Sequence, residues 1–211
     1  MNRLATINYP PGVARARTRT RGFTLIEVLV VLAIMALLGV LIVFSPGLSR
    51  ANNLTAAGNM VTNDIAYARE LAIANNQKTA VWFLQPSGGT FLTALQIYTY
   101  DQNGVATSYG PVHHLPAEVG LDSGTLLSPL FASGNKLTWT LPNVQPTIPS
   151  FPSGYNAWSI GFMPDGSTTA SQTWYFTLHD IKFGNQLPVL PANYAVVSID
   201  YVTGAVSLYR P

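Results

Sequence analysis

A basic leader runs directly into a long uncharged apolar segment, and this junction restricts the possible folds more than any other feature. Residues 1–22 hold five arginines and no Asp or Glu, whereas residues 28–44 are seventeen successive residues without a charge. As a helix, residues 23–44 would be about 33 Å long, close to the roughly 30 Å hydrocarbon core of a bilayer. Because basic residues favour the cytoplasmic side, the sequence predicts a single membrane-spanning helix with its N-terminus in the cytoplasm.

Glu27 is the only charged residue in the apolar segment that starts at Phe23. An ionised carboxylate inside a membrane is costly unless a partner neutralises it, so such residues tend to be functional. No Ala-x-Ala cleavage site follows the apolar segment, and any cut is therefore expected before it, after Gly22. Such a cut would create an α-amino group on Phe23, one helical turn from Glu27, and an amine on a neighbouring helix could equally pair with the carboxylate.

The segment from Arg21 to Leu38, which begins Arg-Gly-Phe-Thr-Leu-Ile-Glu, resembles the processing and methylation site of type IV pilins and type II secretion pseudopilins. The resemblance implies that a prepilin peptidase and methyltransferase cuts after Gly22 and N-methylates Phe23, and that Glu27 aligns each incoming subunit with other pilins in a filament. It also implies a bacterial inner-membrane protein with a periplasmic head, which later joins a periplasmic or surface filament. A static single-pass envelope protein and a mitochondrial presequence are the alternatives.

The chain is expected to contain one folded head behind the apolar helix. Once the leader is removed, six basic residues face nine acidic residues, so the pI of about 8.9 describes only the precursor. The absence of cysteine excludes disulfides and thiolate metal sites. The predicted parts are a cleaved leader, a transmembrane and assembly helix, an amphipathic helical continuation and a β-rich head, at residues 1–22, 23–45, 46–77 and 78–211.

Apolar residues resume at helical spacing after Pro46 and predict an amphipathic helix that covers a sheet and ends at about Asn76. Pro46 is expected to bend or interrupt the helix because it has no N–H to donate. Residues 68–73, followed by residues 81–83, resemble a pilin subgroup that contains the H-type minor pseudopilin and the T-type fimbrial minor pilin. Arg69 and Glu70 fit equally well as a solvated surface pair. The apolar stripe consists of Leu54, Ala57, Val61, Ile65, Ala68 and Ala72.

From Thr79 onward, short aromatic and β-branched runs separated by turn dipeptides predict a mainly antiparallel sheet. The expected fold class is therefore α+β, and the resemblance implies the pilin arrangement, with a long N-terminal helix packed on the sheet. Asn103-Gly104 and Thr203-Gly204 are predicted hairpin turns. Residues 110–152 hold seven of the fifteen prolines and are expected to form a surface excursion with little regular structure. Strands are predicted at residues 79–85, 91–100, 136–141, 157–163, 173–179, 194–200 and 205–209.

Two segments near the C-terminus extend the resemblance to the minor pilin subgroup. Residues 161–167 look like its loop of phenylalanine, proline and glycine, and residues 197–206 look like its closing hairpin. Asp165 and Asp200 are interpreted as turn residues, because the dense oxygen-ligand spacing of a calcium loop is missing.

No sequence pattern supports an enzyme, and no catalytic, cofactor-binding or metal-binding residue is predicted. The chain has no nucleophile elbow, no phosphate-binding glycine loop and no His-Glu-x-x-His pair. His113 and His114 should point to opposite faces of a strand, and with His179 they are interpreted as ordinary surface histidines. A DNA-binding or adhesive tip pilin is the alternative function, although the chain after residue 79 holds only Lys136, Lys182 and Arg210 to meet phosphates.

Overall fold

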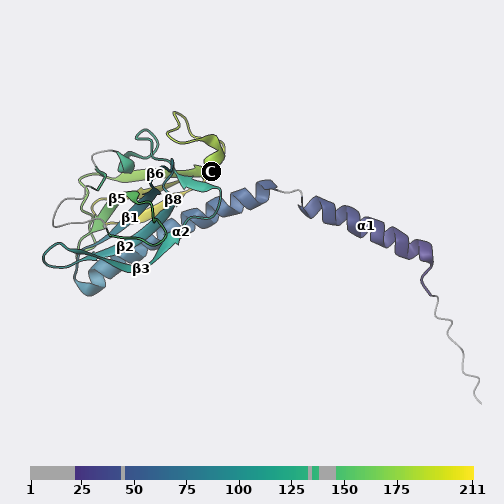
Figure 1. Cartoon of the computed structure of the whole chain (residues 1–211), viewed down its shortest axis with the longest axis horizontal. Helices are drawn as coiled ribbons and strands as arrows, with labels where there is room; N and C mark the ends of the chain where they lie inside the picture. Colours follow the sequence, from purple (N-terminus) through teal and green to yellow (C-terminus); the bar gives the residue numbers. More distant parts are fainter. Residues whose placement is uncertain (1–21, 44–45, 133–134, 138–145) are drawn as a thin grey trace, which may run out of the picture. The chain divides into compact units, whose positions relative to one another are not determined.

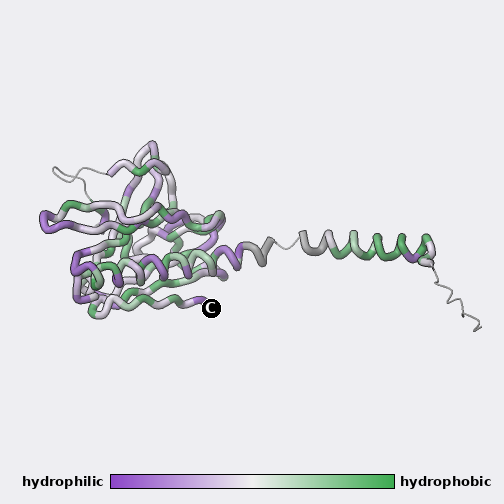
Figure 2. The backbone as a smooth tube through the Cα atoms, turned by 90° about the horizontal axis from the view of Figure 1, so that it is seen from below, coloured by the Kyte–Doolittle hydropathy of each residue, from purple (hydrophilic) through white to green (hydrophobic). Residues whose placement is uncertain are grey.

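The computed structural model describes residues 22–43, 46–132, 135–137 and 146–211. The chain divides into two compact units, Met1–Ser45 and Pro46–Pro211. The first unit contains helix α1 (Leu25–Val43), and its side chains from Leu25 to Leu38 are apolar except for Glu27. Figure 2 shows this hydrophobic character along most of the helix. Within the described parts of the chain, no helix combines the length and the apolarity needed to cross a membrane.

Helix α2 (Pro46–Asn75) opens the second unit and confirms the predicted amphipathic pattern. It ends in a Schellman motif, because Asn76 adopts φ +48° and the N–H of Gln77 donates to the carbonyl oxygen of Ala72 at 3.1 Å. The predicted end of the helix is therefore confirmed. All six residues of the expected stripe are buried: Leu54, Ala57, Val61, Ile65, Ala68 and Ala72.

The rest of the second unit consists mainly of two four-stranded antiparallel sheets, which confirms the predicted α+β class (Figure 1). An isolated bridge between Leu92 and Leu121 joins the two sheets. The first sheet has the order β3-β2-β1-β5 and contains β1 (Thr79–Pro86), β2 (Ala94–Tyr100), β3 (Ala106–His114) and β5 (Tyr155–Phe162). The second has the order β4-β6-β7-β8 and contains β4 (Val119–Leu121), β6 (Trp174–Asp180), β7 (Tyr194–Ile199) and β8 (Val206–Tyr209).

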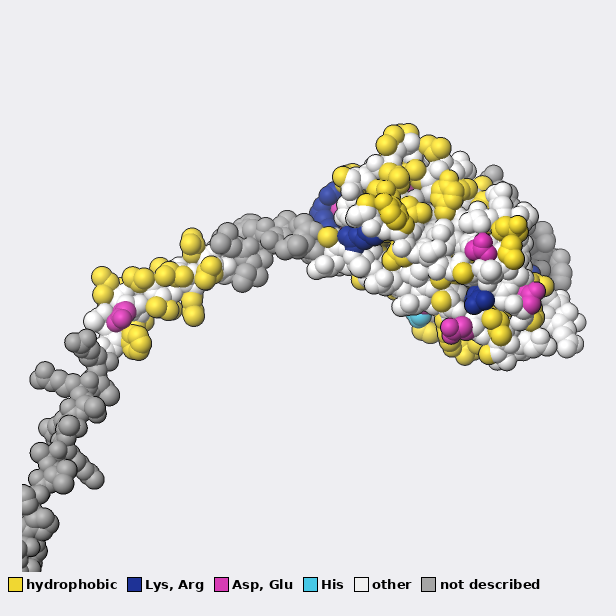
Figure 3. Space-filling model, turned by 180° about the vertical axis from the view of Figure 1, so that it is seen from behind, with side chains coloured by type: hydrophobic (Ala, Val, Ile, Leu, Met, Phe, Trp, Pro, Cys, Tyr) yellow, Lys and Arg dark blue, Asp and Glu magenta, His cyan; other side chains and the backbone are white. Residues whose placement is uncertain are grey.

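The core lies on both faces of the first sheet, so β1 is buried along most of its length. On one face, the stripe of α2 packs with Phe83 of β1 and with apolar residues of the second sheet such as Phe176. On the other face, the rings of Trp82 and Tyr98 stack with centroids 3.7 Å apart, and Phe151 helps to cover them. Figure 3 shows that charged side chains are thinly spread over one face of this unit.

Two strands and two segments differ from the sequence prediction. β3 and β4 were not expected, and β3 is mostly exposed, so pairing with β2 and not an apolar pattern makes it a strand. The excursion expected at residues 110–152 is wrong for residues 110–114, which belong to β3, and for residues 115–131, which supply Leu121 and Phe131 to the core. It is also wrong for Ile148 and Phe151, which are buried on the other face of the first sheet. Of the strand predicted at residues 136–141, Lys136 forms only an isolated bridge to Trp158, and residues 138–141 lie outside the described residues.

Both predicted hairpin turns are confirmed. Asn103-Gly104 connects β2 with β3, and Thr203-Gly204 connects β7 with β8. The glycines adopt φ +77° and +67°, a left-handed conformation that favours glycine.

Candidate assembly and processing site

Gly22, Phe23 and Glu27 lie together at the start of α1. Gly22 and Phe23 precede the helix, and Phe23 is 82% exposed, so the bond between them stands clear of the described side chains. Glu27 is the third residue of the helix and is also exposed. The exposed peptide bond and the carboxylate thus lie within one short stretch of chain.

Thr24 and Glu27 form a reciprocal cap at the N-terminus of α1. The backbone N–H of Thr24 donates to Oε2 of Glu27 at 3.3 Å, and the N–H of Glu27 donates to Oγ1 of Thr24 at 3.3 Å. The Thr24 hydroxyl also lies 3.4 Å from Oε2 of Glu27. This is a capping box: it gives the N–H of Thr24 an acceptor, and it gives a second acceptor to the N–H of Glu27, which also donates to the carbonyl oxygen of Thr24 at 3.0 Å. Sequence reasoning missed Thr24, although the Thr-x-x-Glu spacing was available to indicate it.

The side chains of α1 offer no single apolar face, because large apolar residues are exposed all around the described part of the helix. Leu29, Leu32 and Met35 have exposed fractions of 58%, 59% and 66%. A helix that is hydrophobic on every side is stable only in apolar surroundings, such as lipid or other helices. The unit Met1–Ser45 therefore requires a partner environment that its own described residues do not supply.

Arg69 connects three segments that the sequence analysis had singled out separately. From α2, its Nε donates to the carbonyl oxygen of Thr203 at 2.8 Å and to that of Gly166 at 3.1 Å. Gly166 lies in the loop at residues 161–167, and Thr203 lies in the turn between β7 and β8. The alternative of a solvated Arg69–Glu70 pair is therefore wrong for Arg69, which holds the helix against both turns.

Asp165 and Asp200 act as turn residues, as predicted. Oδ1 of Asp165 accepts hydrogen bonds from the hydroxyl and N–H of Ser167, and Oδ1 of Asp200 accepts the same pair from Thr203. These bonds lower the pKa of both carboxyl groups below the usual aspartate value. Gly204 is required for close approach, because an added Cβ would collide with the carbonyl oxygen of Gly166.

The three histidines occupy different environments. His113 and His114 point to opposite faces of β3, as predicted: Nδ1 of His113 lies 2.8 Å from Oδ2 of Asp64 on α2, and the His114 ring lies 5.7 Å from that of Phe151. The surface interpretation is wrong for His179, which is fully buried. Its burial is possible because its Nε2 lies 3.1 Å from Oδ2 of Asp122 and its Nδ1 lies 3.0 Å from the carbonyl oxygen of Asp180.

Asp122 is fully buried with His179 and is held by several donors. Burial alone would raise the pKa of its carboxyl group, but hydrogen bonds from His179 and from the N–H groups of Gly124 and Leu187 outweigh burial and lower the pKa. Both ring nitrogens of His179 thus face an oxygen atom of another residue. The pair therefore links β6 to the segment after β4 within a closed interior.

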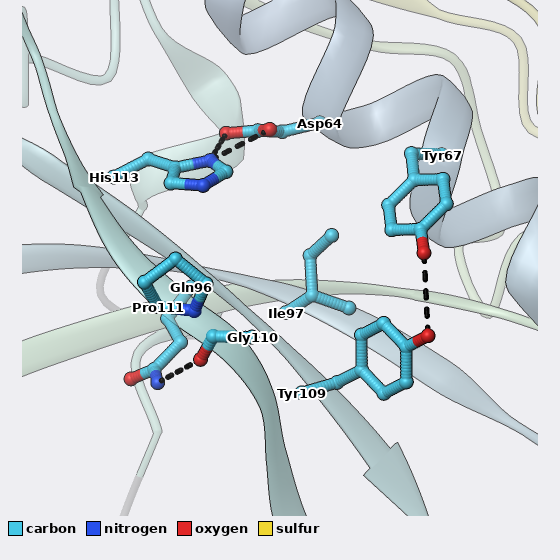
Figure 4. A pocket seen from close by; sticks show the side chains of 8 residues that line it. All are labelled: Asp64, Tyr67, Gln96, Ile97, Tyr109, Gly110, Pro111 and His113. Atoms are coloured by element: carbon cyan, nitrogen blue, oxygen red, sulfur yellow. Dashed lines mark hydrogen bonds and ion pairs between the residues drawn. The ribbon is translucent and has the colours of Figure 1, made fainter.

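A hollow of about 240 Å³ lies between α2 and β3 (Figure 4). Its polar end is the Asp64–His113 pair, and at its other end the hydroxyl groups of Tyr67 and Tyr109 lie 3.3 Å apart. Among the residues that line it there is no serine, threonine, cysteine or lysine to act as a nucleophile. Within the described residues, no three His, Cys, Asp or Glu side chains gather closely enough to hold a metal ion.

Residues 17–43 match the family model of the prokaryotic N-terminal methylation motif. The comparison with curated proteins found no match. Among solved structures, the type IV minor pilin FimU of Pseudomonas aeruginosa is 13% identical, with a TM-score of 0.45 over 76% of this chain and 93% of that chain. The minor pseudopilin EpsH from the Type 2 Secretion System of Vibrio cholerae is 10% identical, with a TM-score of 0.44 over 75% and 98%. At these low scores, the likeness alone establishes neither a shared fold nor a function.

The matched motif contains Gly22, Phe23 and Glu27 together with the Thr24 cap and all of α1. It stands in front of an α+β head of two antiparallel sheets. The chain therefore carries a prokaryotic N-terminal methylation motif in front of a folded head.

Proposed function

We propose that the protein is a minor pilin or pseudopilin, a structural subunit that a prepilin peptidase processes and that assembles into a type IV pilus or a type II secretion pseudopilus. The observation that carries this proposal is the methylation motif at residues 17–43. In this proposal, residues 1–22 are the leader that is removed, and residues 23–45 anchor the chain in the inner membrane. Residues 46–77 continue the helix, and residues 78–211 form a periplasmic head.

The chemistry of α1 supports a role in assembly. Its apolar side chains are exposed around the helix, and packing them against sibling helices removes them from lipid contact in exchange for close side-chain packing. Glu27 is the only charged residue of the helix. An N-terminal amine on the Phe23 of a neighbouring subunit would neutralise this carboxylate and thereby fix the register of the two helices.

The first experiment determines the mature N-terminus. We expect the full chain, co-expressed with a prepilin peptidase, to begin at N-methylated Phe23 when the intact mass is measured. Gly22→Leu should block the cut, because it places a bulky side chain at the cleaved bond. Gly39→Ala is the matched control, since Gly39 has open space around it, and it should be processed normally. An uncut wild-type chain, or a cut after Phe44, would overturn the proposal.

A further inference from the structure

The hollow between α2 and β3 lies wholly within the second unit of the chain. α2 supplies Asp64 and Tyr67, which are three residues apart and therefore lie on one face of the helix. β3 supplies Tyr109 and His113 from the opposite side, and Figure 4 shows Ile97 of β2 between the two pairs. A carboxylate and an imidazole thus stand at one end of the hollow, and two aromatic rings stand at the other.

An irregularity in β3 accompanies the hollow. One residue of β2, Gln96, stands opposite three residues of β3, Gly110, Pro111 and Val112. Such bulges re-aim side chains and interrupt the pairing of an edge strand. β3 is the edge of its sheet, but Pro111 has no N–H to offer to a further strand. This part of the edge is therefore unsuited to strand addition, and a partner is expected to contact it through side chains.

The size of the hollow favours a single side chain as its occupant. Its volume of about 240 Å³ is below the roughly 300–1,000 Å³ of pockets that enclose whole cofactors or drug-sized ligands. Tyr67 and Tyr109 are 46% and 41% exposed, so the hollow has two aromatic rings beside its opening to solvent. Tyrosine is enriched where proteins contact one another. The hollow therefore suits one side chain that a partner protein inserts.

The charges around the hollow favour a cation. Among the described residues that line it, Asp64 is the only carboxylate and His113 is the only group that can carry a positive charge. A neutral His113 leaves one net negative charge, and a protonated His113 only cancels that charge. An anion gains no net attraction in either case. Glu70, three residues after Tyr67 on α2, adds a second carboxylate beside the aromatic end.

The hydrogen bonds of the hollow leave acceptors free for a ligand. Nδ1 of His113 lies 2.9 and 2.8 Å from the two oxygens of Asp64, and it carries the proton because an ionised carboxylate can only accept. The hydroxyl of Tyr67 donates to that of Tyr109. A carboxylate accepts more hydrogen bonds than one N–H can supply, so Asp64 keeps acceptor capacity beyond His113. The matching ligand group therefore brings several donors and needs no acceptor.

We propose that the hollow binds an arginine side chain of a partner protein, with the guanidinium against the carboxylate of Asp64 and the rings of Tyr67 and Tyr109. A guanidinium has several N–H donors and no acceptor, and it stacks on aromatic faces. It is also flat and more weakly hydrated than the ammonium of lysine, which favours arginine at such a site. The inference concerns the second unit alone and does not depend on the proposed anchoring of the chain.

The test is a titration of the full chain in detergent micelles, followed by NMR of isotope-labelled isoleucine methyl groups. Ile97 lies in the hollow, and Ile199, which is fully buried in the second sheet, is the internal control. N-acetyl-arginine amide should shift the Ile97 methyl signal and leave the Ile199 signal in place. N-acetyl-citrulline amide has nearly the same shape without the charge, and it should bind about tenfold more weakly.

Three substitutions test the contacts themselves. Asp64→Asn should weaken the binding of N-acetyl-arginine amide about tenfold, because it removes the charged acceptor. Tyr109→Leu should also weaken it, whereas Tyr109→Phe keeps the aromatic face and should retain most of the affinity. Glu118→Gln is the matched control, since it removes an exposed carboxylate that does not line the hollow, and it should bind as wild type. An unchanged Ile199 signal in each variant reports an intact fold.

The comparison of ligands on the wild-type chain needs no substitution and decides the inference by itself. Absence of a shift at Ile97, or equal binding of the arginine and citrulline amides, would overturn it. Tighter binding of N-acetyl-lysine amide would overturn the assignment to a guanidinium. Tighter binding of free arginine than of its blocked amide would overturn the assignment to a protein side chain and indicate a small-molecule site.

Discussion

At the scale of single residues, Glu27 already has a hydrogen-bond partner within its own chain. Its carboxylate accepts from Thr24 and closes the capping box of α1, so it is already hydrogen-bonded in the single chain. These bonds are 3.3–3.4 Å long, at the weak end of the usual range. A cationic amine makes a stronger, charge-assisted bond with a carboxylate. Under the proposed function, the N-terminal amine of a neighbouring subunit would replace this cap as the partner of Glu27.

This exchange predicts different results for the two residues of the cap. Glu27→Ala should remove the subunit from sheared filaments, because it removes both the cap and the charge that sets register. Thr24→Val should reduce incorporation only modestly, since it costs about 1 kcal/mol of helix capping and keeps the charge. Immunoblots of sheared filaments and of membranes measure both. Glu70→Ala, an exposed glutamate on α2, is the control and should behave as wild type. Normal incorporation of Glu27→Ala would contradict the assembly role.

At the scale of elements, Arg69 connects helix α2 to two turns of the head. Its guanidinium donates to two backbone carbonyls that lie 97 and 134 residues along the chain. Arg69→Met keeps the length of the side chain and leaves these carbonyls without their charged donor. The free energy of unfolding should fall by about 2 kcal/mol, the usual contribution of hydrogen bonds to a charged group. Urea denaturation in detergent measures the change. Glu70→Ala should stay within about 0.5 kcal/mol of wild type, and an equal effect of both substitutions would contradict the role of Arg69.

The sequence predicts elements whose signals are local and misses those that depend on distant partners. The stripe of α2 carries its own periodicity and β1 is marked by its run of apolar and aromatic residues, and both are observed. β3 is polar and contains Gly110 and Pro111, so only its pairing with β2 reveals it. The contacts of Arg69 were hidden because its acceptors are backbone carbonyls, which leave no mark in the sequence. The burial of His179 depends on Asp122, 57 residues away, and neither residue shows a recognisable spacing.

At the scale of the whole molecule, the two units differ in whether their apolar side chains are buried. The second unit contains its own core and, in Asp122 and His179, a buried hydrogen-bonded pair that stays within the fold. Among the described side chains of the first unit, the large apolar ones are exposed, and one carboxylate, that of Glu27, lies at the start of α1. The second unit thus buries its apolar residues within itself, whereas the described apolar side chains of α1 stay available for lipid or for other helices.

The lowered pKa values of three aspartates in the second unit predict how the stability of the head depends on pH. Asp122, Asp165 and Asp200 all have pKa values lowered below 3.8 in the folded state. Above that value, folded and unfolded chains are both ionised at these positions and the stabilisation is complete. As the pH falls through the lowered pKa values, the unfolded chain binds more protons, so the stabilisation is lost. Thermal unfolding between pH 2 and pH 6 should therefore show a melting temperature that falls below about pH 4.

Asp122→Asn tests which carboxylate contributes to this acid response. It should lower the melting temperature at neutral pH, because His179 loses its ionised partner inside the fold. It should also make the decline below pH 4 shallower than in wild type, since one carboxylate with a lowered pKa is gone. Val202→Ser changes an exposed residue that does not titrate and should keep the wild-type slope. An unchanged slope in Asp122→Asn would show that the turn carboxylates, and not the buried pair, control the acid stability of the head.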